Sequence, residues 1–255
     1  MNVLNSTHKT CLLILFLLIH ANAFAGPSSV YDGLATQVIN TCQEKQLIVL
    51  GENHQQKNST KLFVSLVRKF ACQNKKILVG LEIPRDRQEP LDNALHNPLP
   101  IPDGIIPLII DHTDYHTMLH ELQQLNVDIK AIDATEEENN REQAMFDFLI
   151  HVIASEKYDK ILVLVGNLHA IKNIKWHPAT GHAESDDQFF TGKLIQDGRK
   201  VCSVVQDFSP QRTDGPRVLT TNSSEGAAGA MRTIRAVFHN DNMSGKDVAD
   251  AVVVW

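Results

Sequence analysis

Five short apolar runs, separated by longer amphipathic stretches, set the pattern of the chain. In most of these runs the aliphatic residues are nearly continuous instead of alternating with polar ones, which is typical of strands buried on both faces of a parallel sheet. A further run, "DAVVVW", ends the sequence and is predicted to be the last strand. The five runs lie at residues 46–51, 76–82, 127–133, 160–166 and 200–207.

Amphipathic helices are predicted between these strands, because apolar side chains recur there every three or four positions. Ser59 or Thr60 is expected to cap the first helix. Thr135 and Glu138 have the spacing of a capping box and are expected to open the third helix. The four helices are predicted over residues 59–73, 115–126, 135–156 and 185–198.

The alternation of strands and helices predicts a single α/β domain, in which helices flank a mainly parallel sheet. No stretch between residues 26 and 255 is rich enough in linker residues to separate two domains. Residues 209–229 are rich in small, polar and turn-forming residues, and we expect them to form a long surface loop.

The N-terminal segment has the features of a secretory signal peptide. Lys9 precedes an apolar run at residues 11–25, and Ala23 and Ala25 form a small-x-small cleavage site. The run is shorter than the roughly 20 residues that a membrane span needs. We therefore expect cleavage after Ala25, no stable membrane anchor, and a mature domain at residues 26–255 in the periplasm or outside the cell.

The net charge narrows the choice of partners. The formal net charge at pH 7 is −6. Binding to nucleic acid needs a basic face that contacts phosphate groups. We therefore do not expect nucleic acid as a main partner. The expected partner is a small-molecule or peptide substrate, or haem, and the sequence does not indicate an oligomeric state.

Three cysteines remain after the predicted signal peptide, and an odd number in an oxidising compartment suggests one disulfide and one thiol. Cys42 and Cys72 each stand ten positions before a glutamate, in the similar segments "CQEKQLIVLGE" and "CQNKKILVGLE". Because consecutive strands are usually neighbours in a sheet, we predict a disulfide between Cys42 and Cys72. Three unlinked thiols are the alternative.

Titratable side chains follow the ends of several predicted strands. Glu52 and His54 follow the first strand, Glu82 ends the second, and His169 follows the fourth. Ligands of an open parallel sheet bind in the crevice outside the carboxyl ends of its strands, so we expect these four side chains to share one pocket. Weaker candidates at similar positions are Asp133, Asn167 and Asp207.

Two histidines and two glutamates in one pocket have two chemical uses. His54, Glu82 and His169 can hold a divalent metal ion that activates water, with Glu52 as general base. Without a metal, a histidine or a carboxylate can itself act as general base. The two glutamates would raise each other's pKa unless a positive charge lies between them, which favours the metal ion.

At these positions the chain resembles the superfamily of ChaN-like, Tiki and erythromycin-esterase-like proteins. The similarity lies in the segments "VLGENH", "GLEIPRDRQEPLDNAL" and "VGNLHAIK" and in their order. The segments "DYHTMLHELQQLNVDIKAID" and "DAVVVW" extend it over nearly all of the mature chain, and the ChaN branch is the nearest. Carried over by position, the site of the superfamily corresponds to Glu52, His54, Glu82 and His169. Arg85 could bind an anionic group but receives no family role.

The resemblance implies different functions for different branches. Tiki-type members are similar to metal-dependent peptidases, and erythromycin-esterase-type members hydrolyse a lactone with a histidine and carboxylates. ChaN-type members are linked with haem binding and iron uptake and are usually lipoproteins. No cysteine stands at the predicted cleavage point, which departs from the lipoprotein pattern.

We therefore expect a metal-assisted hydrolase of an ester or amide bond. Haem binding in iron uptake, without catalysis, is the alternative, and a family member that only binds a partner protein is the third possibility. For haem, Tyr115 and His116 are the expected binding residues, because a tyrosinate can ligate iron. The residues His112, His116 and His120 fall on one face of the predicted helix.

Two further segments could border the pocket. Residues 98–110, "PLPIPDGIIPLII", would either form an apolar rim for a porphyrin or pack in the core. His177 and His182 lie in a loop after the fourth strand that could cover the pocket, since long loops near sites often do.

Overall fold

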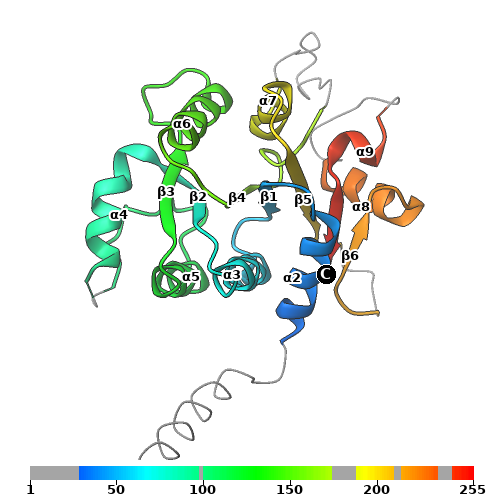
Figure 1. Ribbon diagram of the computed structural model, residues 1–255, viewed down its shortest axis with the longest axis horizontal. Coiled ribbons are helices and arrows are strands. Elements are labelled where there is room, and N and C mark those ends of the chain that lie inside the picture. The colour runs from blue at the N-terminus through cyan, green and yellow to red at the C-terminus, as the bar shows by residue number, and fades with distance from the viewer. Residues whose placement is uncertain (1–28, 98–99, 174–187, 210–213, 235–242) are drawn as a thin grey trace, which may run out of the picture.

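The apolar runs form a seven-stranded sheet (Figure 1). The computed structural model describes residues 29–97, 100–173, 188–209, 214–234 and 243–255, so the predicted signal peptide lies outside the described residues. The strand order is β3-β2-β4-β1-β5-β7-β6, and all neighbours are parallel except β6 and β7. The predicted α/β fold with a mainly parallel sheet is therefore confirmed. The strands are β1 (Leu47–Glu52), β2 (Ile77–Pro84), β3 (Asp128–Asp133), β4 (Lys160–Gly166), β5 (Val201–Asp207), β6 (Arg217–Thr220) and β7 (Ala251–Val254).

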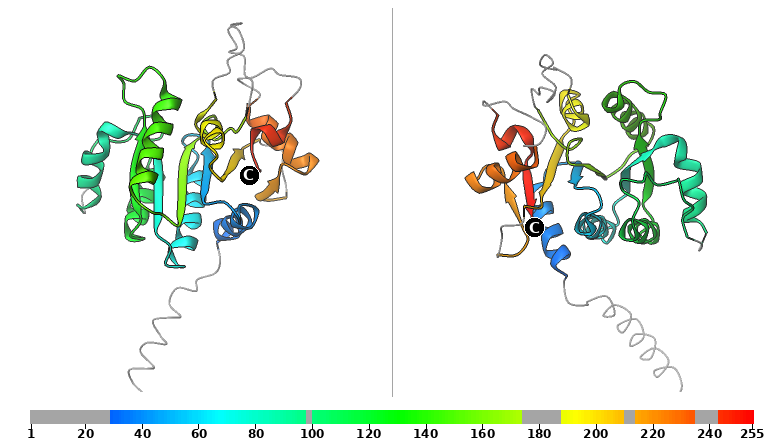
Figure 2. Two further views of the ribbon diagram at one scale, coloured as in Figure 1. Left: turned by 45° about the horizontal axis from the view of Figure 1, so that its top comes forward. Right: turned by 180° about the vertical axis from the view of Figure 1, so that it is seen from behind.

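Helices cover both faces of this sheet, as Figures 1 and 2 show. In Figure 1, α2, α3 and α5 lie on one face, and α6 and α7 lie on the other. None of the described helices is long and apolar enough to cross a membrane. The helices are α2 (Val30–Thr41), α3 (Lys57–Ala71), the 3₁₀ turn η1 (Arg85–Arg87), α4 (Gln88–Leu95), α5 (Thr113–Gln124), α6 (Arg141–Ser155), α7 (Phe190–Gln196), α8 (Ser224–Ile234) and α9 (Gly245–Val248).

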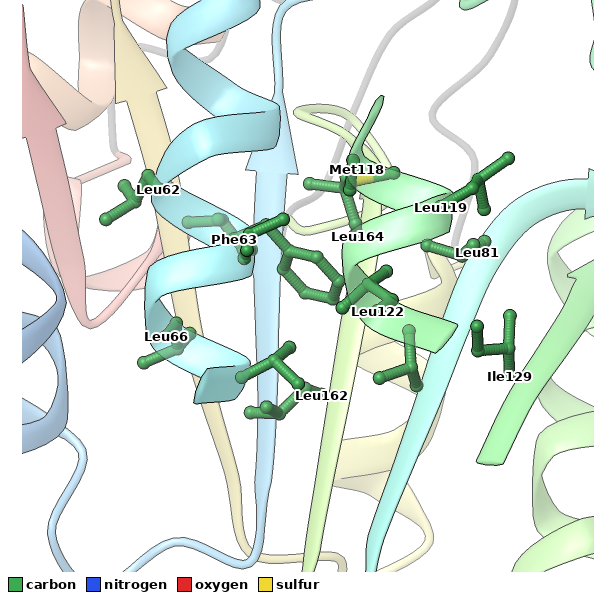
Figure 3. Close-up of a cluster of buried hydrophobic side chains, with 14 of the residues drawn as sticks. Leu62, Phe63, Leu66, Leu81, Met118, Leu119, Leu122, Ile129, Leu162 and Leu164 are labelled. Carbon is green, nitrogen blue, oxygen red and sulfur yellow. The ribbon is translucent and has the colours of Figure 1, made fainter. Parts of the chain in front are cut away.

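Successive side chains of each strand enter two separate hydrophobic cores. Leu50 of β1 belongs to the core under α2, α3 and α5, whereas Val49 belongs to the core under α6 and α7. Figure 3 shows the first core, in which Phe63 of α3 lies close to the side chains that α5 and β4 contribute. Burial on both faces explains why the strands are almost continuously apolar.

The expectation of a long loop over residues 209–229 is wrong in part. The edge strand β6 and the first half of α8 lie within this stretch. β6 is only four residues long and partly exposed, so it lacks an apolar run. α8 is rich in small residues because it approaches its neighbours closely. A Cβ at Gly226 would lie 2.1 Å from the carbonyl oxygen of Thr220.

Two predicted helix starts are also wrong. Ser59 and Thr60 lie inside α3, which begins at Lys57. Thr135 and Glu138 do form their bond, with the Thr135 amide donating to Glu138 Oε2 at 2.9 Å, but it closes a turn before the helix. α6 begins at Arg141, after Asn140 accepts a hydrogen bond from the Gln143 amide at 3.0 Å. This later start places Arg141 and Glu142 in the first turn of α6. Ser185, the predicted start of another helix, lies outside the described residues, as do His177 and His182.

The predicted disulfide between Cys42 and Cys72 is wrong. Cys42 pairs with Cys202, with their Cα atoms 5.6 Å apart, and Cys72 is an exposed free thiol. The prediction assumed that β1 and β2 are neighbours, but β4 lies between them. β5 is the other neighbour of β1, with Cys202 opposite Ile48. This pairing brings Cys202 to the end of α2, where Cys42 lies.

Candidate functional site

The end of β1 delivers a carboxylate and an imidazole that contact each other. Glu52 is buried, and its Oε1 lies 3.2 Å from Nδ1 of the partly exposed His54. This hydrogen bond raises the pKa of His54 above 6.5; burial opposes the shift, and the charge of Glu82 adds to it. Gln55, with a φ of 64°, turns the chain sharply after His54. Glu52 and His54 therefore form a carboxylate–imidazole dyad at the tip of the strand.

The other ring nitrogen of His54, Nε2, lies over the end of β4. A Cβ at Gly166 would lie only 3.0 Å from His54 Nε2, a tight contact, and 3.5 Å from Glu82 Oε2, an ordinary one. No group in the described part of the chain is within hydrogen-bonding reach of this Nε2. It is therefore the nitrogen that remains for a ligand.

Glu82, at the end of β2, is buried among positive groups. Its Oε1 accepts a hydrogen bond from Arg141 Nη2 at 2.5 Å and lies 3.3 Å from His169 Nε2. Its Oε2 accepts a hydrogen bond from the backbone N–H of Gly166. Burial alone would raise the pKa of Glu82, but His169, Arg141 and the Gly166 amide together lower it to about 2. Glu82 is an anion at neutral pH.

Arg141 links the ends of β2 and β3. Its Nε donates to Asp133 Oδ1 and its Nη2 to Asp133 Oδ2, each at 2.7 Å, in a bidentate pair. Its guanidinium thereby joins Asp133 to Glu82, both of which are buried. Asp133 therefore takes part in the site through Arg141.

His169 is enclosed between two carboxylates. Its Nε2 faces Glu82, and its Nδ1 lies 2.7 Å from Glu142 Oε1 as an ion pair rather than an aligned hydrogen bond. The other oxygen of Glu142 accepts a hydrogen bond from the Phe190 amide at 2.6 Å. Burial lowers the pKa of His169, but the two carboxylates outweigh burial and raise it to about 10.

We expect the imidazole of His169 to stay protonated up to at least pH 8, whereas an ordinary histidine loses its proton near pH 6.5. Because its folded pKa is raised, the stability it contributes is complete below about pH 6.5 and is lost as the pH rises towards 10. An NMR titration of the histidine Cε1–H signals, with the His169 signal assigned from His169→Gln, measures this pKa. A midpoint near 6.5 would show that the two carboxylates do not act on His169 as the structure indicates.

These groups line a pocket of about 520 Å³ at the carboxyl edge of the sheet. The four principal candidates from the sequence all line it, and so does Asp207. Asn167 also lines it, but its side chain ties β4 to β5: Nδ2 donates to the Gln206 carbonyl and Oδ1 accepts from the Gln206 amide, each at 2.9 Å.

Three side chains of the site were not predicted from the sequence. Arg141 and Glu142 were placed inside a helix thought to begin at Thr135, and Arg232 of α8 fell just after the predicted loop. Only the Asn140 cap, with Gln143 three residues on, could have indicated that α6 starts at the edge of the pocket. No comparable signal marks Arg232.

The proposed ligands His54, Glu82 and His169 do not fit a metal ion. Both oxygens of Glu82 already bind protein donors, and both ring nitrogens of His169 face carboxylates. Within the described ranges no group of three or more His, Cys, Asp or Glu side chains is arranged around a common point for a metal. Arg141 and His169 supply the positive charge beside Glu82 that the sequence argument assigned to a metal ion.

The residues suggested for haem do not line this pocket and fit a haem poorly. The side chain of Tyr115 is in the core, and its hydroxyl has no hydrogen-bond partner among the described residues. Burial, with the charges of Glu52 and Glu82, raises the pKa of Tyr115 far above its usual value, which disfavours the tyrosinate that would bind iron. His116 Nε2 is 2.6 Å from Asp111 Oδ1, and His112 caps α5.

The other segments suggested for the pocket also lie elsewhere. Arg85 pairs with Glu138 and does not line the pocket. Four isoleucines of the apolar stretch at residues 98–110 pack in the core: Ile101, Ile105, Ile106 and Ile110. Its exposed large hydrophobic side chains among the described residues are Leu108 and Ile109, at 86% and 56%.

Comparisons with known proteins give similarity of structure alone. No family model matches the sequence, and no curated protein matches it. A Bacillus cereus protein superposes with a TM-score of 0.57 at 10% identity, over 90% of this chain and 92% of that one. The type III effector HopBA1 gives 0.51 at 11% identity over 86% and 92%, and the haem-binding ChaN of Campylobacter jejuni gives 0.50 at 14% identity over 88% and 91%. At such identities the likeness shows the fold alone, and the chain has a ChaN-like fold.

Proposed function

We propose that the chain is a hydrolase of an ester or amide bond in which His54 activates water. The observation that supports this most directly is the Glu52–His54 dyad, with Nδ1 held by a buried carboxylate and Nε2 left for a ligand in the pocket. A histidine held in this way is a general base whose tautomer and orientation are fixed. Membership of the ChaN-like, Tiki and erythromycin-esterase-like superfamily is part of the proposal, supported by the fold and by the strand-end motifs.

In the proposed reaction, groups that line the pocket account for each bond that changes and each proton that moves. His54 Nε2 takes a proton from water as the water oxygen forms a bond to the carbonyl carbon. The carbonyl electrons move to oxygen, and the resulting oxyanion is stabilised by a positive donor, for which Arg141 is available because its side chain is 47% exposed in the same pocket. When the intermediate collapses, the bond to the leaving group breaks and the imidazolium returns its proton to that group.

The assignment makes His54 the base and Glu52 a positioning residue. Glu52 was expected from the sequence to be the base, but its side chain is 3% exposed and its Oε1 faces Nδ1 of His54. A proton moving from water therefore reaches the imidazole first. Glu82 contacts both Arg141 and His169, and we assign Glu82 and His169 to holding the Arg141 guanidinium in place.

Replacing His54 by glutamine is expected to lower kcat/KM for 4-nitrophenyl acetate by about 10²- to 10⁴-fold, the usual contribution of a positioned general base. The matched control is His151→Gln, which changes an exposed histidine on α6. In the unchanged protein kcat/KM should rise with pH, with a midpoint above 6.5, because only neutral imidazole accepts a proton. In Glu52→Gln the midpoint should move down, since the Glu52 hydrogen bond is the largest cause of the raised pKa. Equal activity of the two histidine variants would refute the role of His54.

Haem binding without catalysis is the alternative, and the structural likeness to a haem-binding ChaN is what supports it. A haemin titration separates the two proposals. A saturable Soret shift that is lost in Tyr115→Phe or His116→Gln, together with absent hydrolysis, would favour haem carriage.

Location in the periplasm or outside the cell is also part of the proposal. It is supported by the Cys42–Cys202 disulfide, because disulfides are typical of oxidising compartments.

A further inference from the structure

A second arginine is fixed beside the pocket by a buried carboxylate. Arg232 Nε and Nη2 both donate to Asp207 Oδ2, at 2.8 and 2.6 Å. Asp207 Oδ1 accepts hydrogen bonds from the Ser209 amide at 3.1 Å and from the Ser209 hydroxyl at 2.6 Å. Both oxygens of Asp207 are therefore engaged within the protein, so Asp207 orients the guanidinium and is not itself available to a ligand.

The pocket offers a ligand mainly cationic donors. The Arg141 and Arg232 side chains are 47% and 26% exposed, whereas Glu82, Asp133 and Asp207, the carboxylates that bind them, are 4–8% exposed. Within the described residues no group bonds to Nη1 of either arginine. A guanidinium whose orientation is already fixed loses little entropy when it binds, and its planar donors match a carboxylate or phosphate group.

An aromatic side chain, Phe208, lines the same pocket as Arg232. Phe208 lines the pocket and stacks on Trp255, with ring centroids 5.6 Å apart and planes at 14°. Trp255 is held in turn by its Nε1, which donates to Gln206 Oε1 at 2.9 Å. A substrate anchored by Arg232 can therefore lay its carbon skeleton against Phe208.

We propose that the pocket takes a substrate that carries a carboxylate or phosphate group, and that Arg232 binds this group while the scissile bond lies at His54. The inference rests on the proposed hydrolysis and adds the class of substrate. In this proposal Arg232 determines the specificity for anionic substrates, whereas Arg141 stabilises the oxyanion that forms from the reacting carbonyl.

The test compares two esters that differ in one charge: the 4-nitrophenyl monoester of glutaric acid and its methylated, uncharged counterpart. The ratio of kcat/KM for the charged ester to that for the uncharged ester should fall roughly 10- to 100-fold in Arg232→Gln, the loss expected for one charge-assisted hydrogen-bonded contact. The matched control is Arg199→Gln, because Arg199 pairs with Asp197 and does not line the pocket. It should keep the ratio of the unchanged protein.

A second variant separates a folding defect from the loss of the anion site, and a binding measurement separates the anion site from hydrolysis. If Arg232→Gln fails to fold because Asp207 loses its cation, Asp207→Asn/Arg232→Gln removes both charges together and should show the same fall. Calorimetric titration with glutarate tests the anchor without catalysis. Glutarate binding that is lost in the Arg232 variants, with neither ester hydrolysed, would support the anion site and overturn the hydrolase. Hydrolysis of both esters at a ratio unaffected by either variant would overturn the anion site and leave the hydrolase standing.

Discussion

Replacing both Cys42 and Cys202 by serine is expected to lower the free energy of unfolding by about 5 kcal/mol, because the disulfide closes a loop of 160 residues. A cross-link over so long a segment removes much of the conformational freedom of the unfolded chain. It also ties the end of α2 to the start of β5, so α2 stays packed against the core. Urea denaturation of a protein of residues 26–255, followed by circular dichroism, measures the loss.

The control for this prediction is Cys72→Ser. Cys72 is an exposed free thiol, so its replacement should change stability by less than about 0.5 kcal/mol. A thiol titration of the unfolded, unreduced protein of residues 26–255 should return one free thiol. Three free thiols, or a double variant as stable as the control, would contradict the pairing.

The disulfide also shows which part of the fold could be predicted from the sequence. Continuous apolar runs identify strands because burial on both faces leaves no room for polar positions, and β1, β2, β4 and β5 were found in this way. The same runs do not state which strands pair. The order β2-β4-β1 places a strand from the second half of the chain between two from the first, and the cysteine prediction failed at that point.

The candidate site also has a part that could be predicted from the sequence and a part that could not. Glu52, His54, Glu82 and His169 could be predicted because a parallel sheet collects its strand ends at one edge, whichever strands are neighbours. The helical members of the site could not. Arg141 reaches Glu82 only because α6 starts there, and an arginine in the first turn of a helix is usually exposed to solvent. Its partners are set by tertiary packing, which no local pattern encodes.

Arg141→Met is expected to lower the free energy of unfolding at pH 7 by about 2–4 kcal/mol, because the change leaves Glu82 and Asp133 buried without their shared cation. The lower end of the range allows for the solvent that reaches the half-exposed guanidinium. Methionine keeps much of the length and volume of the side chain, so the loss measures charge more than packing. Urea denaturation against the unchanged protein gives the difference.

The matched control is Arg68→Met, which breaks a surface pair with Glu121 and should cost about 1 kcal/mol or less.

The pH dependence of stability separates the contribution of the Arg141 charge from that of its packing. In the unchanged protein the pKa of Glu82 is lowered, so the stability it contributes is present above about pH 4.5 and is lost as the pH falls towards 2. Without Arg141, Glu82 takes up a proton more readily, and the variant should differ less from the unchanged protein at pH 4 than at pH 7. A difference that is constant with pH would mean that Arg141 contributes packing alone, and that the positive charge beside Glu82 comes from His169.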